Sequence, residues 1–99
     1  MNKFIIAVEG GTSEQLNAIT AYLNTKGSYW HWMSHLWLFI PTDQDMSADA
    51  IRDDMTKFLT GDVTRMVFHV GVPHTGDEFT WAGWGDVKSA QWLEKYWKP

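Results

Sequence analysis

The sequence predicts an α+β domain in which helices cover one face of an antiparallel sheet and a further helical segment follows. Three observations predict this class. Short apolar runs end at glycine or proline, as strands do. Between these runs lie two segments that each have a capping residue and a helical apolar stripe. The last segment of the sequence is a helical pattern with an aromatic face. The length of 99 residues suits one domain, which we place at residues 1–99.

A strand and a helix are predicted first. Residues 4–8 read FIIAV, a continuous apolar run that is too short for a helix and typical of a central strand. Thr12 with Gln15 three residues later predicts a capping box, and Gly27 predicts the helix end. The apolar stripe of this helix comprises Leu16, Ile19 and Leu23.

Residues 29–40 read YWHWMSHLWLFI, and both faces of a strand through them would be largely apolar. Twelve residues are long for one strand. A bulge or turn near Ser34 would split them into two strands, which form a bent ribbon or hairpin. We interpret the segment as mainly buried, with one face formed by Trp30, Trp32, Leu36 and Leu38 and the other by Trp37 and Phe39.

Ser47 predicts the cap of a second helix, whose buried stripe comprises Ile51, Met55 and Phe58. Residues 65–70 and 79–84 are predicted as strands, and Asp86 as the cap of an aromatic-faced helix over residues 87–97. This order is the ferredoxin-like βαββαβ plan, an antiparallel sheet with helices on one face, plus a C-terminal helical appendage. We expect the open apolar face of such a sheet to meet a second copy.

Composition narrows the possible functions. The net charge is −4, and no two of the 8 Lys and Arg residues are adjacent, which disfavours a protein that coats long nucleic acids. The chain has no cysteine and no apolar run long enough to span a membrane, and its first residues lack the features of a signal peptide. We therefore expect a cytoplasmic protein without a membrane partner. With 7 tryptophans in 99 residues, we expect some at a surface that binds something.

The order of aromatic anchors resembles small SinR-like proteins, which are similar to the CRISPR-associated protein 2 family. The residues that carry this resemblance are Tyr29-Trp30-His31, Trp37-Leu38-Phe39, Thr42-Asp43, Ala50-Ile51-Arg52-Asp53, Trp81-Ala82-Gly83-Trp84 and Gln91-Trp92-Leu93. The resemblance implies a ferredoxin-like fold and a homodimer built through sheet faces or edges. It also implies two kinds of relative, namely metal-dependent nucleases and non-catalytic structural dimers.

Glu9 is the candidate metal ligand. The nuclease relatives carry an aspartate at the end of the first strand, where this chain has the longer Glu9. Two copies in a dimer could hold one Mg²⁺, and the other interpretation is a carboxylate beside the N-terminus of the first helix. His31 and His35 would lie roughly 13 Å apart on an extended strand, too far to share an ion unless a turn at Ser34 brings them together.

Five residues are the candidate ligand-binding set. Trp81 and Trp84 would stack on a base or purine ring, or else pack the C-terminal helix across the sheet or a dimer interface. Arg52 and Arg65 offer bidentate contacts to phosphate, or else are surface arginines, and His31 completes the set.

The first functional hypothesis is a non-enzymatic homodimeric binding protein for a nucleotide-like small ligand or a protein partner. It needs no cofactor and fits a role in phage–host defence or counter-defence. The chain does not assemble the acids and bases that hydrolysis requires, so enzymatic activity is not predicted from the residues themselves. The alternative is a divergent endoribonuclease of the CRISPR-associated protein 2 type, with Glu9 and Mg²⁺. A third is an interaction subunit whose aromatic face docks on a larger protein.

Overall fold

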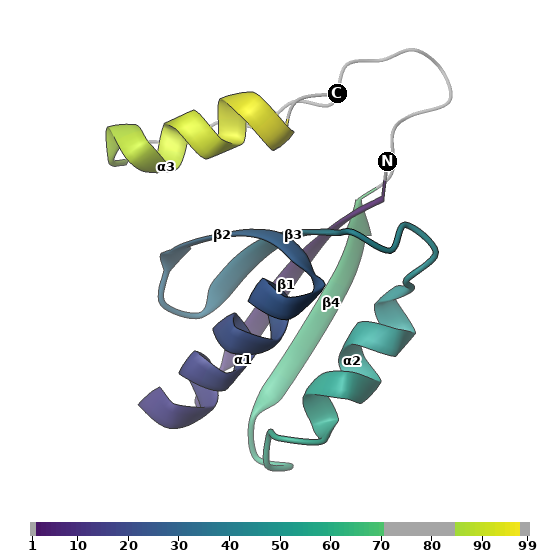
Figure 1. Ribbon diagram of the computed structural model, residues 1–99. Coiled ribbons are helices and arrows are strands. Elements are labelled where there is room, and N and C mark those ends of the chain that lie inside the picture. The colour runs from purple at the N-terminus through teal and green to yellow at the C-terminus, as the bar shows by residue number, and fades with distance from the viewer. Residues whose placement is uncertain (1, 71–84, 98–99) are drawn as a thin grey trace.

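The structure is a computed structural model that describes residues 2–70 and 85–97 (Figure 1). Trp81, Trp84 and the strand predicted at residues 79–84 lie outside the described residues. The elements in chain order are β1 (Lys3–Glu9), α1 (Ser13–Lys26), β2 (Gly27–Met33), β3 (Leu36–Pro41), α2 (Ala48–Thr56), β4 (Thr64–Val70), α3 (Val87–Trp92) and the π-helical stretch η1 (Leu93–Trp97). In this part of the chain no helix is long and apolar enough to cross a membrane.

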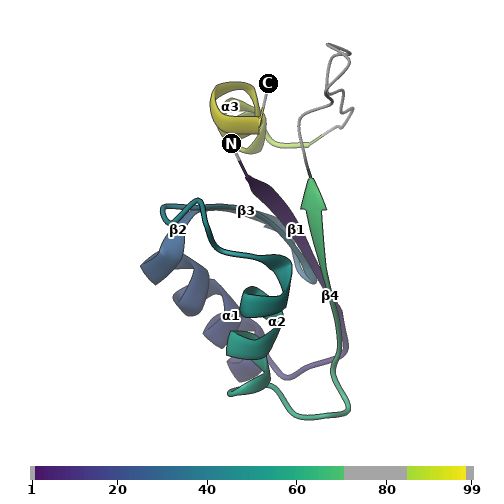
Figure 2. The same ribbon diagram turned by 90° about the vertical axis from the view of Figure 1, so that its right-hand side faces the viewer.

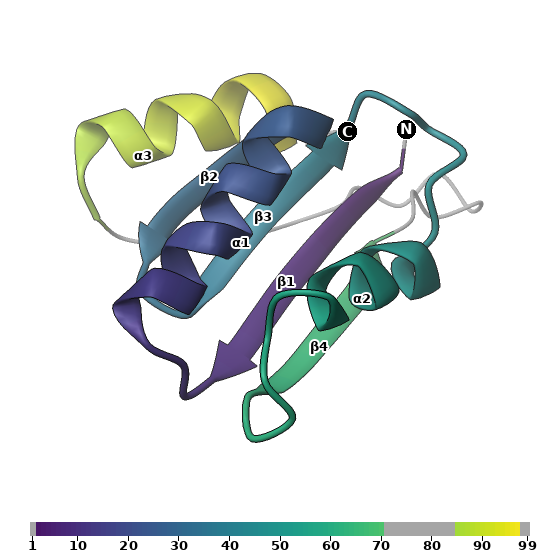
Figure 3. The ribbon, with the colours of Figure 1, turned by 60° about the horizontal axis from the view of Figure 1, so that its bottom comes forward.

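The four strands form one antiparallel sheet in the order β2-β3-β1-β4. Because β3 lies antiparallel between β1 and β2, these two strands run parallel to each other, and α1 connects them. α1 and α2 cover one face of the sheet, and α3 lies on the other (Figures 2 and 3). The α+β class, the antiparallel sheet and the C-terminal helix are therefore confirmed.

The predicted caps position the helices. The Thr12 hydroxyl accepts a hydrogen bond from the Gln15 N–H at 3.2 Å, and the Gln15 side chain accepts one from the Thr12 N–H at 2.8 Å, which completes the capping box of α1. α1 ends at Lys26, and the N–H of the capping residue Gly27 donates to the Leu23 carbonyl. Only glycine fits there, since a Cβ atom would lie 2.2 Å from the carbonyl oxygen of Ile40.

The other two helices also start at the predicted residues. The Ser47 hydroxyl accepts from the Ala50 N–H at 3.1 Å at the start of α2. The Asp86 carboxylate accepts from the Lys88 N–H at 2.8 Å at the start of α3.

The main core lies between the sheet and the pair α1 and α2. Trp37 is fully buried in it, and its indole N–H donates to the Thr20 hydroxyl on α1 at 3.0 Å. The buried residues of this core are Phe4, Ile6, Val8, Ile19, Leu23, Trp37, Phe39, Ile51, Met55, Leu59 and Val63.

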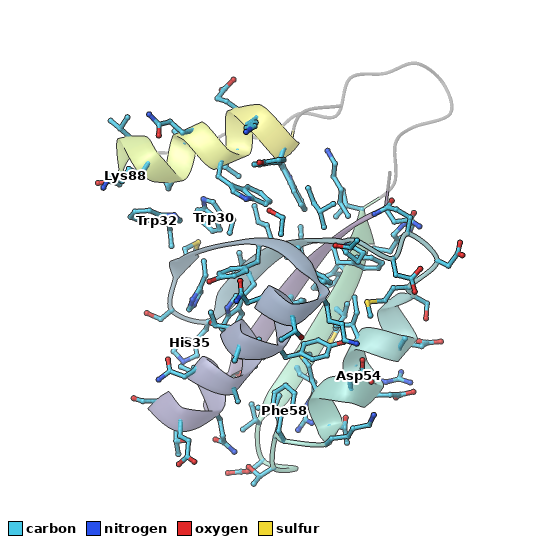
Figure 4. All side chains as sticks on the ribbon, viewed as in Figure 1. Trp30, Trp32, His35, Asp54, Phe58 and Lys88 are labelled. Carbon is cyan, nitrogen blue, oxygen red and sulfur yellow. The ribbon has the colours of Figure 1, made fainter. Side chains whose placement is uncertain are left out.

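A second, smaller core forms on the other face of the sheet beneath α3 and η1. Trp97 is buried there against Leu38 and Ile40. Two indole hydrogen bonds hold the helix in place. The Trp30 N–H donates to the Ser89 carbonyl, and the Trp92 N–H donates to the Ser28 hydroxyl, both at 3.1 Å. Figure 4 shows Trp30 between the sheet and α3.

Residues 29–40 form the predicted hairpin. β2 and β3 meet at Met33 and Leu36, and the register shifts between Trp30 and Met33. The predicted faces are confirmed for β3, since Trp37 lies in the main core and Leu38 in the second core. The prediction that the segment is mainly buried is wrong at the end of β2, where Trp32 is 52% and Met33 56% exposed. The second core beneath α3 and η1 includes Trp30, Leu36 and Leu38 but not Trp32 or Met33.

Candidate interaction surface

One row of apolar side chains crosses the whole sheet on the face opposite α1 and α2. Met33 pairs with Leu36, Leu36 with Ala7, and Ala7 with Met66. Directly opposed residues of antiparallel strands project on the same side of a sheet. Leu36 precedes Trp37, which points into the main core, so this row points away from that core.

The neighbouring row is covered at one end only. It comprises Trp30, Leu38, Ile5 and Phe68. The second core covers Trp30 and Leu38, whereas Phe68 on the edge strand β4 stays 48% exposed.

We call the uncovered part the open sheet surface. Its exposed members are Trp32 and Met33 on β2 and Met66 and Phe68 on β4. Half-buried Ala7 and Leu36 lie between them on the two central strands, and Leu36 also packs against the second core. Met66 is 51% exposed, and Figure 4 shows Trp32 on the side of the hairpin that faces α3. Apart from Val87 and Tyr96, these four are the exposed large hydrophobic residues of the described chain.

This face of the sheet carries almost no charge. The described strands place only two ionisable side chains on it, Lys3 at one end and Glu9 at the other. Lys3 is buried, its ammonium lies 5.4 Å from the centre of the Trp97 ring, and burial lowers its pKa. The acidic residues of α2 lie on the opposite side of the sheet; they are Asp49, Asp53 and Asp54.

Glu9 is exposed at the end of β1, opposite Thr64. It projects on the same face as the open sheet surface, one position beyond the row of Ala7 and Met66. Among residues 2–70 and 85–97, no three His, Asp or Glu side chains lie close enough together to hold a metal ion. Within the described residues of one chain, Glu9 is therefore not part of a cluster that could hold a metal ion.

The two predicted arginines lie apart and are engaged differently. Arg52 is exposed on α2, where its guanidinium lies 3.1 Å from Asp53 and 3.6 Å from Asp49. Arg65 is half-buried on the helix side of β4; it donates to the Val63 carbonyl at 3.0 Å and to the Thr60 carbonyl. Arg65 thereby fastens the loop between α2 and β4.

His31 lies on the helix side of β2. Its ring stacks on Trp37 at 4.3 Å with an angle of 16° between the ring planes. Its Nδ1 lies 3.4 Å from the Thr20 hydroxyl and its Nε2 3.2 Å from the Ser34 carbonyl oxygen. The described structure therefore does not gather His31, Arg52 and Arg65 into one site.

Sequence reasoning missed Met66 and Phe68 as surface residues. A signal for them exists in the segment RMVFHV, whose alternate residues Met66, Phe68 and Val70 make one face fully apolar. Met66 and Phe68 alternate with Val67, and the two helices that precede β4 cover one face only. An apolar second face of an edge strand therefore indicates a surface that needs another cover.

The chain matches no protein-family model, and it has no significant match among curated proteins or solved structures.

Proposed function

We propose that this chain is a non-enzymatic binding module that forms a homodimer through its open sheet surface. The observation that carries the proposal is the apolar row across four strands, whose two end residues Met33 and Met66 are exposed, with exposed Phe68 beside it. Contiguous apolar surfaces of this kind are uncommon on monomers and mark interaction sites.

The charge distribution favours a second copy as the occupant. The chain carries a net charge of −4, yet among the described strand residues only Glu9 places a charge at the rim of the open sheet surface. Two copies that meet face to face keep the acids of α2 directed outward, so like charges stay apart. A surface without charge also complements itself across a two-fold axis, as the interface of a symmetric dimer requires. Met33 and Met66 add flexible side chains that adapt to a facing copy.

The ferredoxin-like plan and the kinship with SinR-like and CRISPR-associated protein 2 proteins belong to the same proposal. The order β4-β1-β3-β2, read from the β4 edge, and the placement of α1 and α2 on one face support the ferredoxin-like plan. The aromatic anchors of residues 29–39 support the kinship. Under it, the dimer binds a nucleotide-like ligand or a protein partner in phage–host defence or counter-defence.

Sedimentation velocity over a concentration series tests the dimer. We expect the unaltered chain to sediment as a dimer, and Met66→Glu and Phe68→Glu to sediment as monomers. Burial of an unpaired carboxylate costs about 2 kcal/mol or more, which raises the dimer Kd about 30-fold or more for each site. The matched control is Ala21→Glu, which adds the same charge to an exposed position on α1.

Circular dichroism spectra that match the unaltered chain establish that each variant is folded. A chain that is monomeric at every concentration overturns the proposal. So does a folded Phe68→Glu variant that dimerises as well as the Ala21→Glu control.

One observation favours the alternative of a metal-dependent endoribonuclease. Glu9 is exposed beside the open sheet surface, so a symmetric dimer through that surface brings the two Glu9 carboxylates toward the same seam. The alternative predicts RNA cleavage that requires Mg²⁺ or Mn²⁺ and is lost in Glu9→Gln but kept in Glu14→Gln. Absence of cleavage by the dimer, or full cleavage by Glu9→Gln, rejects it.

A further inference from the structure

A pocket of about 670 Å³ lies at the edge of the sheet formed by the first residues of β2. It is open to solvent and sits between the C-terminal end of α1 and the helix formed by α3 and η1, which Figure 3 shows beside the same end of β2. This is the opposite end of β2 from Met33 and the open sheet surface. The side chains that line the pocket belong to Asn24, Thr25, Ser28, Tyr29, Thr42, Trp92 and Tyr96.

One wall of the pocket is an aromatic surface that is fixed in place. The Trp92 indole is anchored by its hydrogen bond to Ser28, and its ring packs against Tyr96 at 5.5 Å and Trp97 at 6.0 Å. Trp97 is buried and holds this end of the helix on the sheet. Tyr96 is 40% exposed. A ligand therefore meets, at Trp92, a ring whose position is set before binding, which lowers the entropic cost of association.

The rest of the pocket supplies neutral hydrogen-bonding groups. Within the described residues, the side chains of Asn24, Tyr29 and Thr42 make no hydrogen bond. Their amide and hydroxyl groups can therefore bond to a ligand without first breaking a hydrogen bond to the described protein. The Thr25 hydroxyl donates to the Tyr22 carbonyl at 2.7 Å and retains its capacity to accept.

The lining of the pocket favours a neutral ligand over an anion. None of its lining residues carries a charge, and the cation recorded beside them is the Lys95 ammonium, 5.0 Å from the centre of the Tyr96 ring. Asn24 and Thr25 belong to the last turn of α1, the negative end of a helix of 14 residues, which repels an anion further.

We propose that this pocket binds an uncharged small molecule that lays a flat ring on Trp92 and Tyr96 and presents hydroxyl groups to Asn24, Thr25 and Thr42. Nucleosides and sugars both carry this chemistry, and ring stacking on an aromatic side chain tolerates many ring types. The inference deepens the small-ligand part of the proposed function and assigns the ligand a site of its own. It does not depend on the dimer, because the pocket and the open sheet surface lie at opposite ends of β2.

Isothermal titration of the full chain with adenosine, uridine, glucose and galactose, one at a time, tests the proposal. We expect at least one of the four compounds to bind with a Kd below about 1 mM. If only the nucleosides bind, the ligand class is a nucleoside; if only the sugars bind, it is a sugar. Tyr96→Ala and Asn24→Ala should each weaken that binding about 10-fold, since each removes one group from an exposed wall. The control is Asn17→Ala, which removes the same amide group as Asn24→Ala from an exposed position on α1 outside the pocket.

Three results overturn the proposal. The first is the absence of measurable binding by all four compounds. The second is tighter binding of adenosine monophosphate than of adenosine, which contradicts the neutral character of the site. The third is an unchanged Kd in Tyr96→Ala. If no compound binds but the chain still dimerises, the pocket proposal is wrong and the dimer proposal stands. The two proposals therefore fail in different experiments.

Discussion

The hydrogen bond between Tyr22 on α1 and Asp54 on α2 provides a quantitative test of how the two helices are held together. The Tyr22 hydroxyl donates to the Asp54 carboxylate at 2.5 Å, and its ring packs on Phe58 at 5.9 Å. Tyr22→Phe keeps the ring and removes only the hydroxyl. A hydrogen bond to a charged group contributes about 1.5–3 kcal/mol. The Asp54 side chain is 29% exposed and regains water in the variant, so we expect the lower end, a loss of about 1.5 kcal/mol.

The pH dependence of this loss follows from the two pKa values. The Tyr22 hydroxyl, with a smaller contribution from Lys57, holds the pKa of Asp54 below its usual value. A carboxylate with a lowered pKa contributes stability above its unfolded pKa of about 4, and that stability is lost as the pH falls through the folded value. Burial, and then the bond to Asp54, raises the pKa of Tyr22, so the folded state keeps the phenol proton. That contribution is present below the unfolded pKa of 10.0 and declines as the pH rises above it.

Urea unfolding at about pH 3, 7 and 10.5 measures the free energy of unfolding of both proteins in these windows. The difference between wild type and Tyr22→Phe should be largest at neutral pH and should shrink on both sides. The control is Tyr96→Phe, whose exposed phenol should change the free energy by less than about 0.5 kcal/mol. A Tyr22→Phe loss no larger than that of the control, or an equal loss at every pH, refutes the reasoning.

Two further substitutions test the second core and the turn before β2 by the same unfolding assay. Trp97→Ala should lower the free energy of unfolding by about 3 kcal/mol because the ring is only 2% exposed. The control Val87→Ala, at a side chain that is 72% exposed, should lower it by less than about 0.5 kcal/mol. Similar losses in the two variants contradict the docking of η1 on the sheet. Gly27→Ala should lower the free energy of unfolding by at least about 2 kcal/mol, since the new Cβ would lie 2.2 Å from the Ile40 carbonyl oxygen. Gly61→Ala is the control, because a Cβ there meets no atom within 4 Å. Equal stability of the two glycine variants contradicts the close approach of β2 and β3.

Local signals in the sequence predicted the elements because each signal acts over a few residues. The capping box of Thr12, the cap at Ser47 and the turn near Ser34 all lie where the pattern placed them. The dimer, the ligand and the roles of Glu9 and the arginines stay predictions. So do those of Trp81 and Trp84, which lie outside the described residues.

What the sequence left open depends on contacts between distant segments. The bonds that fix the C-terminal helix join Trp30 to Ser89 and Ser28 to Trp92, residues 59 and 64 positions apart. No periodicity reports such a pairing, so the face that this helix covers could not be read from the residues around it. The pocket against Trp92 was missed for the same reason, because α1, β2 and η1 each supply part of it.

The dimensions of the C-terminal helix explain why part of the sheet stays uncovered. α3 has 6 residues and η1 has 5, so together they are about 16 Å long and about 10 Å wide. Four strands of up to 7 residues present a face of roughly 20 Å by 15 Å, about twice that footprint. Between Lys3 and Glu9 at its two ends, that face carries mostly apolar side chains, including Met66 and Phe68 at the β4 edge. A helix of this size buries only one half, and a second copy over the other half would bury the remainder without displacing Trp92 or Trp97 from the sheet.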